Sequence, residues 1–249
     1  MMNINANIVR RVSVRDYSGE LLSQDIIDSI KKHIGALKPI DDGIRVKISL
    51  LPREEFVARF SERLAHEAPY YFVLSSEDKP GFQINAGFIM EQLVIYLTAL
   101  DLGTCYLGSV KPQKDSDSLK HVICLAFGRP KNPMFRISAE QFKRKASESL
   151  YSGEITEISM MRLIEAARLA PSAINLQPCR YVVEGNTIHV YRKKPFLGIK
   201  MLDGIQRVDT GIALSHILMQ AREEGMHGKF LKMKRSAAKE IYEISAIFE

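Results

Sequence analysis

Two short stretches of this sequence carry several polar side chains at a spacing that could bind a ligand. In the first, Arg11, Ser13 and Arg15 stand at alternate positions. Alternate residues of an extended chain share one side, so two guanidiniums and a hydroxyl could hold a phosphate through charge-assisted hydrogen bonds. A solvated basic surface would give the same pattern, and the motif alone does not separate these alternatives.

The second stretch is residues 169–183, LAPSAINLQPCRYVV, between an expected helix and an expected strand. Its two prolines restrict the backbone. Ser172, Asn175 and Gln177 offer neutral donors and acceptors, which suit the edge of a flat polar heterocycle better than a metal or a proton transfer. A helix end followed by a turn would explain one of these polar residues but not all of them.

The composition is that of a soluble globular chain. Of the 249 residues, 46% are hydrophobic and 26% are charged, which allows a substantial buried core. The three cysteines form no CxxC pair and the six histidines are scattered, so we expect no metal site. The start of the chain has no secretory pattern and no stretch is apolar enough to span a membrane, which predicts a cytoplasmic protein without a membrane partner.

The net charge of +6 raises the alternative of a nucleic-acid partner. Basic clusters occur at 142–145, 191–194 and 229–235, without aromatic residues interleaved at the spacing that stacks bases. We interpret the last two clusters as solvated surface and expect no nucleic-acid partner. A small phosphate ligand would account for one localised cluster.

Hydrophobic periodicity predicts a mixture of helices and strands. We expect strands at 43–51, 69–76 and 121–130, a hairpin with a Gly-Asn turn over 179–192, and a loop or short strand near 103–110. We expect helices within 3–16, 21–35, 52–68, 85–103, 155–170 and 209–225, and a helical tail over 237–249.

The sequence also indicates an internal duplication. YSGE occurs at 17–20 and again at 151–154, a shift of 134 positions, and the helices that follow match in phase. The long apolar helices within 85–103 and 209–225 correspond as well, with their ends at a shift of 122. We therefore expect two similar halves packed as one pseudo-symmetric unit, the covalent counterpart of a twofold homodimer.

The expected halves, 1–145 and 146–249, differ in their polar motifs. Where the first half has its Arg/Ser motif, the second has KASESLY at 145–151. Where the second half has APSAINLQP, the first has ALKPIDDG at 36–43. Each half keeps one motif and lacks the other, so we expect one ligand site per chain rather than two.

Together the two motifs resemble those of the flavin-dependent nitroreductases, which carry an RRSxR-type motif and a downstream APSxxNxQPW motif. The resemblance covers nearly the whole chain and is closest to the subfamily in which two nitroreductase-like halves are fused. It implies an α+β chain with the nitroreductase-like three-layer α/β/α fold. It also implies an FMN-dependent oxidoreductase that passes reducing equivalents from NAD(P)H to a small acceptor such as a nitroaromatic or a quinone. The alternative is a flavin-binding protein without turnover, for sensing or storage.

The resemblance further implies that a single FMN is held by residues of both halves, in a monomer that acts as a pseudo-dimer. No protein side chain is expected to be catalytic, because the flavin does the chemistry. Cys179, Ser215 and His216 are expected in buried or pocket-wall positions. The cofactor-binding residues that the resemblance implies are Arg11, Ser13, Arg15, Leu107, Gly108, Lys143, Lys145, Ser172 and Asn175.

Two positions depart from the family pattern. Ala173 stands where a second serine is frequent, and Cys179 stands where the pattern has a tryptophan. The chain contains no tryptophan at all, so the surroundings of the flavin should differ at this point.

Overall fold

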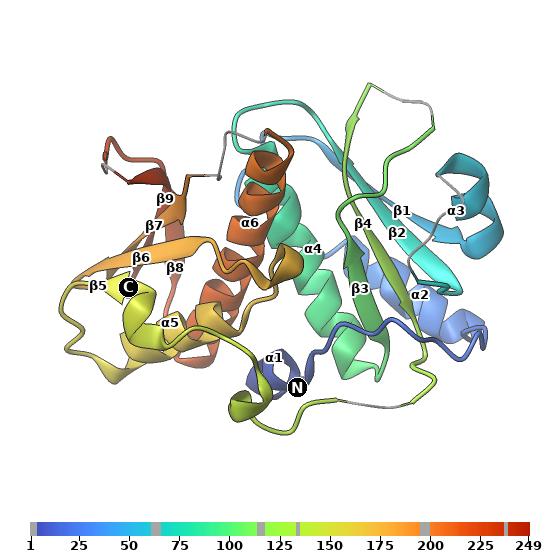
Figure 1. Ribbon diagram of the computed structural model, residues 1–249, viewed down its shortest axis with the longest axis horizontal. Helices are drawn as coiled ribbons and strands as arrows, with labels where there is room; N and C mark the ends of the chain where they lie inside the picture. Colours follow the sequence, from blue (N-terminus) through green and yellow to red (C-terminus); the bar gives the residue numbers. More distant parts are fainter. Residues whose placement is uncertain (1–3, 61–65, 114–117, 133–134, 195–199, 237–238) are drawn as a thin grey trace.

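Two β-sheets lie on either side of a central layer of helices in the computed structural model of the chain (Figure 1). The structure describes residues 4–60, 66–113, 118–132, 135–194, 200–236 and 239–249. The mixed helix and strand composition expected from the sequence is confirmed. Among the described helices, none combines the length and the apolar character that crossing a membrane requires.

The first sheet is antiparallel throughout and has helices on both faces. Helices α2 and α4 pack against one face, and α3 packs against the other. Because both faces are covered, the central strands are hydrophobic along most of their length, as the sequence predicts. This half therefore has the expected three layers. In spatial order its strands are β1 (Val46–Pro52), β2 (Tyr70–Ser76), β4 (Lys120–Gly128) and β3 (Gly103–Leu107).

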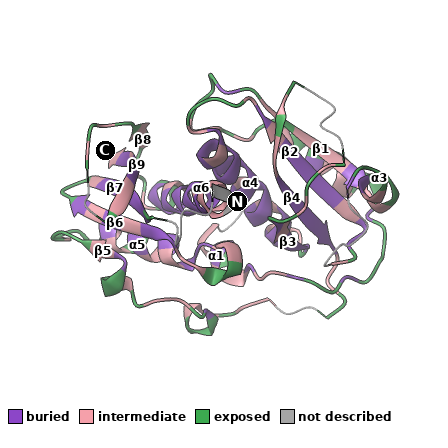
Figure 2. Ribbon diagram, turned by 45° about the horizontal axis from the view of Figure 1, so that its top comes forward, coloured by how far each residue is buried: buried purple, intermediate pink, exposed green. Residues whose placement is uncertain are grey.

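The second sheet packs one face against α5 and α6. The register of β6 with β7 places the polar residues Arg180, Glu184 and His189 together on the opposite face. Figure 2 shows this sheet beside α5 and α6, with buried and less buried residues mixed along its strands. All its strand pairs are antiparallel except the short parallel pair between β5 and β6. In spatial order its strands are β5 (Tyr151–Ser152), β6 (Cys179–Glu184), β7 (Thr187–Lys193), β9 (Glu240–Phe248) and β8 (Gly228–Leu231).

The two long helices α4 and α6 cross in the middle of the molecule at two glycines. A Cβ atom on Gly87 would lie 2.1 Å from the carbonyl oxygen of Val208, and one on Gly211 would lie 2.0 Å from that of Ile84. Only glycine permits such close backbone contact. The helices are α1 (Ile4–Arg10), α2 (Gln24–Ile34), α3 (Arg53–Arg59), α4 (Phe82–Ala99), α5 (Ile158–Leu169) and α6 (Lys200–Glu223).

The two sheets share one strand order. From β1 onward the first sheet runs β1-β2-β4-β3, and from β6 onward the second runs β6-β7-β9-β8. Along the chain, a long helix follows the second strand of each half: α4 lies between β2 and β3, and α6 lies between β7 and β8. The element that breaks the match is α3, which lies between β1 and β2, whereas β6 and β7 form the expected hairpin through a turn at Gly185.

Four sequence expectations need correction. The helix expected over 52–68 is shorter, because α3 ends at Arg59 and Phe60 already forms a β-bridge with Pro112. The tail is not helical: residues 240–248 form β9, because its Ile, Tyr and Phe residues suit a pleated sheet and two neighbouring strands supply hydrogen bonds. Helix α1 ends at Arg10, and the chain is extended from residue 11. Helix α6 begins at Lys200 rather than near 209, and the buried Arg192 on β7 holds its first turns through Asp203 (2.5 Å).

Candidate functional site

Residues 11–17 form an extended segment that runs beside β3. Ser13 pairs with Thr104 in a parallel bridge, and the amide of Val14 donates to the Thr104 carbonyl (2.9 Å). The side chain of Val14 lies directly over Gly103, where a Cβ atom would be 2.5 Å from Val14 Cγ2. This contact fixes the position of the Arg/Ser motif against the sheet.

Arg11 opens the segment and is almost wholly buried, with 3% of its surface exposed. Its Nε atom is buried and has no hydrogen-bond partner among the described residues. Burial lowers the pKa of Arg11, and the neighbouring Glu91 and Tyr106 oppose that shift. A buried guanidinium with an unused donor is unfavourable, so Arg11 is placed to bind a further acceptor.

Two more guanidiniums lie close to Arg11. Arg136 donates to the Arg11 carbonyl and sits 4.1 Å from the ring centroid of Phe142, and Arg144 lies 5.3 Å from the same ring. Burial, together with the positive charges of Arg11 and Arg136, lowers the pKa of Arg144 to about 10. We call Arg11, Arg136 and Arg144 the guanidinium cluster. Repulsion among its charges favours binding of an anion.

The connection from α5 to β6, residues 171–178, has an unusual backbone. Ile174, Asn175 and Gln177 have φ angles of 44°, 58° and 50°. This left-handed region costs about 1–2 kcal/mol for a residue other than glycine, and a β-branched residue such as Ile174 is a marked outlier there. Such a backbone persists only where the surrounding contacts hold it.

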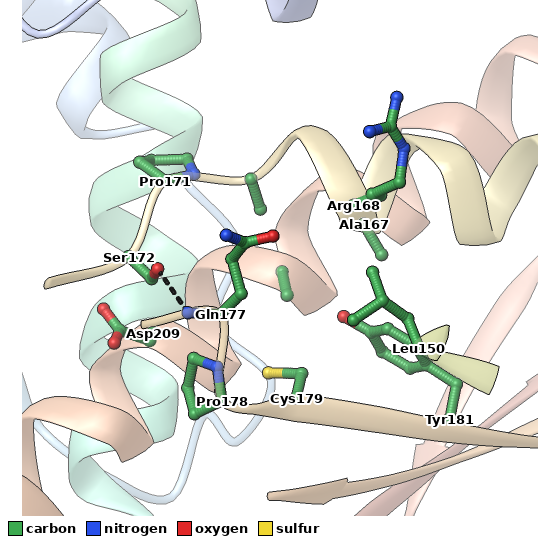
Figure 3. Close-up of a pocket in the computed structure, with 12 residues that line it drawn as sticks. Leu150, Ala167, Arg168, Pro171, Ser172, Gln177, Pro178, Cys179, Tyr181 and Asp209 are labelled. Carbon is green, nitrogen blue, oxygen red and sulfur yellow. Dashed lines mark hydrogen bonds between the residues drawn. The ribbon is translucent and has the colours of Figure 1, made fainter. Parts of the chain in front are cut away.

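Contacts from within the connection and from α6 hold this backbone. Ser172 Oγ accepts from the amide of Gln177 (2.9 Å), which closes the loop on itself (Figure 3). Asp209 Oδ1 on α6 accepts from the amide of Ala173 (3.1 Å). These two hydrogen bonds hold Ala173 and Gln177, which lie on either side of Ile174 and Asn175.

The end of the first half also crosses the connection and bonds to it. Arg144 Nη1 donates to Asn175 Oδ1 (2.7 Å), and Asn175 Nδ2 donates to the Lys143 carbonyl (2.9 Å). The amide of Lys145 donates to Gln177 Oε1 (2.8 Å), and its Nζ donates to the carbonyl of residue 176 (2.8 Å). Arg144 thus joins the guanidinium cluster to the connection.

A buried polar group behind Arg11 links α4, α6 and β3. Glu91 Oε1 lies 2.7 Å from His216 Nε2, and the Tyr106 hydroxyl donates to Glu91 Oε2 (2.8 Å). His216 Nδ1 faces the Ala166 carbonyl (3.0 Å), which can only accept, so Nδ1 carries a proton. The other ring nitrogen, Nε2, faces the Glu91 carboxyl group. The burial expected for His216 is confirmed.

A small cavity lies beneath the connection, between α5, α6 and β6 (Figure 3). Its volume of about 20 Å³ has room for one water molecule. Cys179 lines it, and burial raises the pKa of this thiol to about 12, so the thiol stays protonated. A flavin cannot enter this cavity and would have to lie outside the connection.

Beyond Leu107, which is buried, the chain leaves β3 at Gly108, which is exposed. A wider hollow of about 390 Å³ opens there, between the starts of α4 and α6. Its walls include Phe82, Ile205 and Val208, so it is largely apolar. This hollow is large enough for part of a small aromatic molecule.

The structure places the expected site residues in three groups. The first group is joined by Arg144, which lies near Arg11 and bonds to Asn175, with Lys143 and Lys145 on either side of it. Ser172 belongs to this group, because it lies in the same connection as Asn175. Ser13 and the pair at 107–108 lie along β3, at its start and end respectively. Arg15 is exposed and lines a different hollow, with a volume of about 910 Å³, together with His66 and Lys131.

Sequence reasoning missed several residues of this region. Asp209 comes two residues before the crossing glycine of α6, and Asn85 comes two residues before the crossing glycine of α4. This match between the two helices could have identified Asp209 from the sequence. Arg136 and Glu91 gave none, because only folding brings them near Arg11. Across the described ranges, no cluster of three or more His, Cys, Asp or Glu side chains could hold a metal ion.

Comparison with known proteins places the chain in a family. The family described as "Putative TM nitroreductase" matches residues 3–221. A crystal structure of a "putative nitroreductase" from Thermotoga maritima MSB8 is similar, with a TM-score of 0.69 and 24% identity, over 99% of this chain and 94% of that one. A nitroreductase family protein from Clostridium difficile 630 has a TM-score of 0.51 and 14% identity, over 62% of this chain and all of that one.

No curated protein matches the sequence. The family match covers far more than half of the residues, and the first of these structures shares the fold over almost the entire length. The chain therefore belongs to the TM nitroreductase family.

Proposed function

We propose that this protein is an FMN-dependent oxidoreductase of the nitroreductase type. It would pass reducing equivalents from NAD(P)H to a small acceptor such as a nitroaromatic or a quinone. The observation that carries the proposal is the guanidinium cluster, whose buried Arg11 Nε lacks a partner among the described residues, joined through Arg144 to the strained connection. Family membership supplies the reaction class.

The residues present fit the phosphate of FMN. A phosphate monoester carries close to two negative charges and several acceptor oxygens, which would satisfy the unused donor of Arg11 and offset the repulsion in the cluster. Ser13 stands two residues after Arg11, and the exposed Lys143 stands next to Arg144. The Ser13 hydroxyl would add a neutral contact to the phosphate, and the Lys143 ammonium a charged one. Charge-assisted bonds of this kind are the strong ones in proteins.

The flavin ring would then lie along β3 toward its end. The backbone at Leu107 and Gly108 would face the ring on one side, and Ser172 with Asn175 would approach from the connection on the other. When bound, the flavin supplies hydride acceptance from NAD(P)H and electron transfer to the acceptor. The protein would orient the ring, exclude water and admit small apolar acceptors through the hollow beside Gly108.

We also propose that the two halves arose by duplication. The contacts at the helix crossing are reciprocal: Gly87 meets Val208 and Gly211 meets Ile84, and both pairs are related by a shift of 124 positions. Reciprocal contacts are the mark of a twofold interface. The sequence match at the helix ends has a shift of 122, so the second copy lacks two residues between the crossing and the end of its helix.

The position in the other half that would correspond to this site is filled by apolar side chains, which supports one FMN per chain. There Phe230 of β8, the counterpart of β3, contacts Phe88 edge-on with ring centroids 5.4 Å apart. Ile40, in the counterpart of the connection, packs against the same core. Apolar side chains thus occupy the second position.

The direct test of this proposal is whether the protein binds FMN and turns over. We expect the purified protein to bind FMN and to oxidise NADH or NADPH in the presence of a quinone or a nitrofuran. A flavin spectrum without NAD(P)H oxidation would favour the alternative, a flavin-binding protein for sensing or storage. The absence of FMN binding would reject both.

Two matched variants test the phosphate assignment. Arg11→Ala should weaken FMN binding by about ten- to a hundredfold, which corresponds to roughly 1.5–3 kcal/mol for a charge-assisted bond. The motif alone predicts a similar loss for Arg15→Ala, but its position at a separate hollow favours a smaller one. Unchanged FMN affinity in Arg11→Ala would show that the phosphate lies elsewhere.

A further inference from the structure

Asp209 is a buried carboxyl group with an unused oxygen. Asp209 lies on α6 with 4% of its surface exposed, and its Oδ1 accepts from the amide of Ala173 (3.1 Å). Oδ2 is buried and has no hydrogen-bond partner in the described part of the chain. The carboxyl group lies next to Ser172, on the side of the cavity away from Tyr181 (Figure 3).

The matching residue of the other half shows what the position requires. Asn85 is related to Asp209 by the same shift of 124 positions as the glycine contacts. Asn85 Oδ1 accepts from the amides of Ile40 (2.8 Å) and Asp41 (3.2 Å), and its Nδ2 donates to the Asp41 carbonyl (3.1 Å). Both ends of the Asn85 amide are therefore satisfied, one as acceptor and one as donor. A carboxyl group can provide that donor only when it is protonated.

The surroundings of Asp209 disfavour a negative charge. The Cys179 thiol and the Tyr181 phenol on β6 line the same cavity, and the Tyr106 phenol on β3 is near enough to interact electrostatically with the carboxyl group. Burial raises the pKa of all three groups, so they are neutral. Arg168 also lines the cavity, but its guanidinium is bonded to Glu165 (2.6 Å). Burial raises the pKa of Asp209 to about 7, although the hydrogen bond from Ala173 opposes the shift.

We propose that Asp209 is a positioning residue of the flavin site that is protonated in the complex and donates from Oδ2 to an acceptor of the bound flavin. The bond passes through the one water for which the cavity has room, because Oδ2 is buried beneath the connection and the flavin lies outside it. This inference rests on the proposed function, because Asp209 and the connection it holds would flank the flavin. The flavin ring and its ribityl chain offer several acceptor atoms and no charge at this point.

The consequence is a proton taken up on binding. Below pH 7 the free protein already holds the proton, and affinity is independent of pH. Above pH 7 the free carboxylate must take a proton from solvent when flavin binds. The affinity for flavin should therefore fall about tenfold for each further unit of pH.

The experiment compares wild type with Asp209→Asn, which has the shape of the Asn85 side chain and does not titrate. Riboflavin and FMN affinities are measured by flavin fluorescence between pH 5.5 and 8.5. Riboflavin is needed because the FMN phosphate itself titrates near pH 6. Calorimetry of the wild type at pH 8, in two buffers of different ionisation enthalpy, counts the protons taken up.

We expect wild-type riboflavin affinity to fall above pH 7 with uptake of close to one proton, and the Asp209→Asn affinity to stay level. A pH dependence that is equal in both proteins, or no proton uptake by wild type, would overturn the inference while leaving the proposed function intact. If wild type binds neither flavin at pH 6, the proposed function fails and this inference fails with it.

Discussion

The connection after α5 and the connection after α2 occupy matching places in the two halves, yet their physical states are opposite. Residues 171–178 contain three left-handed residues and an isoleucine, Ile174, that is 86% exposed. Residues 36–43 contain no left-handed residue, and their isoleucine, Ile40, packs into the core. Strain and exposed apolar surface are thus concentrated in one of the two.

The helix residues beneath these connections differ in the same way. Asn85 satisfies both ends of its amide, whereas Asp209 leaves one oxygen without a partner among the described residues. A relaxed and fully bonded connection needs nothing further, but a strained one with an unused polar atom is poised for a ligand. Similar scaffolds therefore carry a relaxed connection in one half and a strained one in the other, and the proposed flavin site rests on the strained one.

The scaffold common to both connections is the helix crossing, and breaking it should have the largest effect. Gly211→Ala places a Cβ atom 2.0 Å from a backbone oxygen, so the helices must separate. We expect a loss of about 3–5 kcal/mol in the free energy of unfolding, measured with denaturant. Gly87→Ala should cost about as much, because the contact is reciprocal.

Gly204→Ala, on the same helix, is the control for this prediction. Its nearest non-neighbouring atom would be 3.9 Å away, so alanine should be neutral or slightly stabilising there. A mild effect of Gly211→Ala, similar to that of Gly204→Ala, would contradict the tight crossing.

The second prediction transfers the carboxyl group to the relaxed half. Asn85→Asp removes the donor to the Asp41 carbonyl and buries a carboxylate in its place. We expect a loss of about 3 kcal/mol at pH 8 and a clearly smaller loss at pH 5, where the new carboxyl can be protonated. Equal losses at both pH values would mean that the two positions are not equivalent.

The third prediction concerns the pH dependence of stability that Asp209 produces. Below about pH 4 the group is protonated in both folded and unfolded chains, and between about 4 and 7 only the folded chain keeps the proton. The folded chain then binds more protons, so the free energy of unfolding falls as pH rises over this range and stays low above it.

Measured by urea unfolding between pH 4 and 8, wild type should lose about 2 kcal/mol more than Asp209→Asn. The full difference in pKa would give about 4 kcal/mol, and water reaching the carboxylate reduces it. Parallel curves for the two proteins would show that Asp209 titrates as an ordinary exposed carboxyl.

The smallest expected effect separates the two isoleucines. Ile174→Gly relieves a left-handed conformation without loss of packing, and we expect a gain of about 0.5–1 kcal/mol in thermal or denaturant unfolding. Ile40→Gly removes packed apolar surface and should lower stability by about 1–3 kcal/mol. If both variants are destabilised alike, the backbone of the connection is not strained.

Much of this organisation could be predicted from sequence. The YSGE repeats and hydrophobic periodicity located nearly every helix and strand, because burial of one face imposes a period on the chain. The short strands β5 and β8 were not predicted, and residues 240–248 were expected to be helical. Their periodicity alone did not settle helix against strand, and the neighbouring β7 and β8 that pair with them come from other parts of the chain.

The sequence by itself determined the family and the two polar motifs, because short-range spacing and residue type specify both. Only the tertiary structure decided that Arg136 and Arg144 crowd beside Arg11, that Arg15 faces a separate hollow, and that Asp209 lies under the connection with an unused oxygen. Charge repulsion, burial and unmet hydrogen bonds depend on residues far apart in the chain. Those quantities exist only once the fold has brought the residues together.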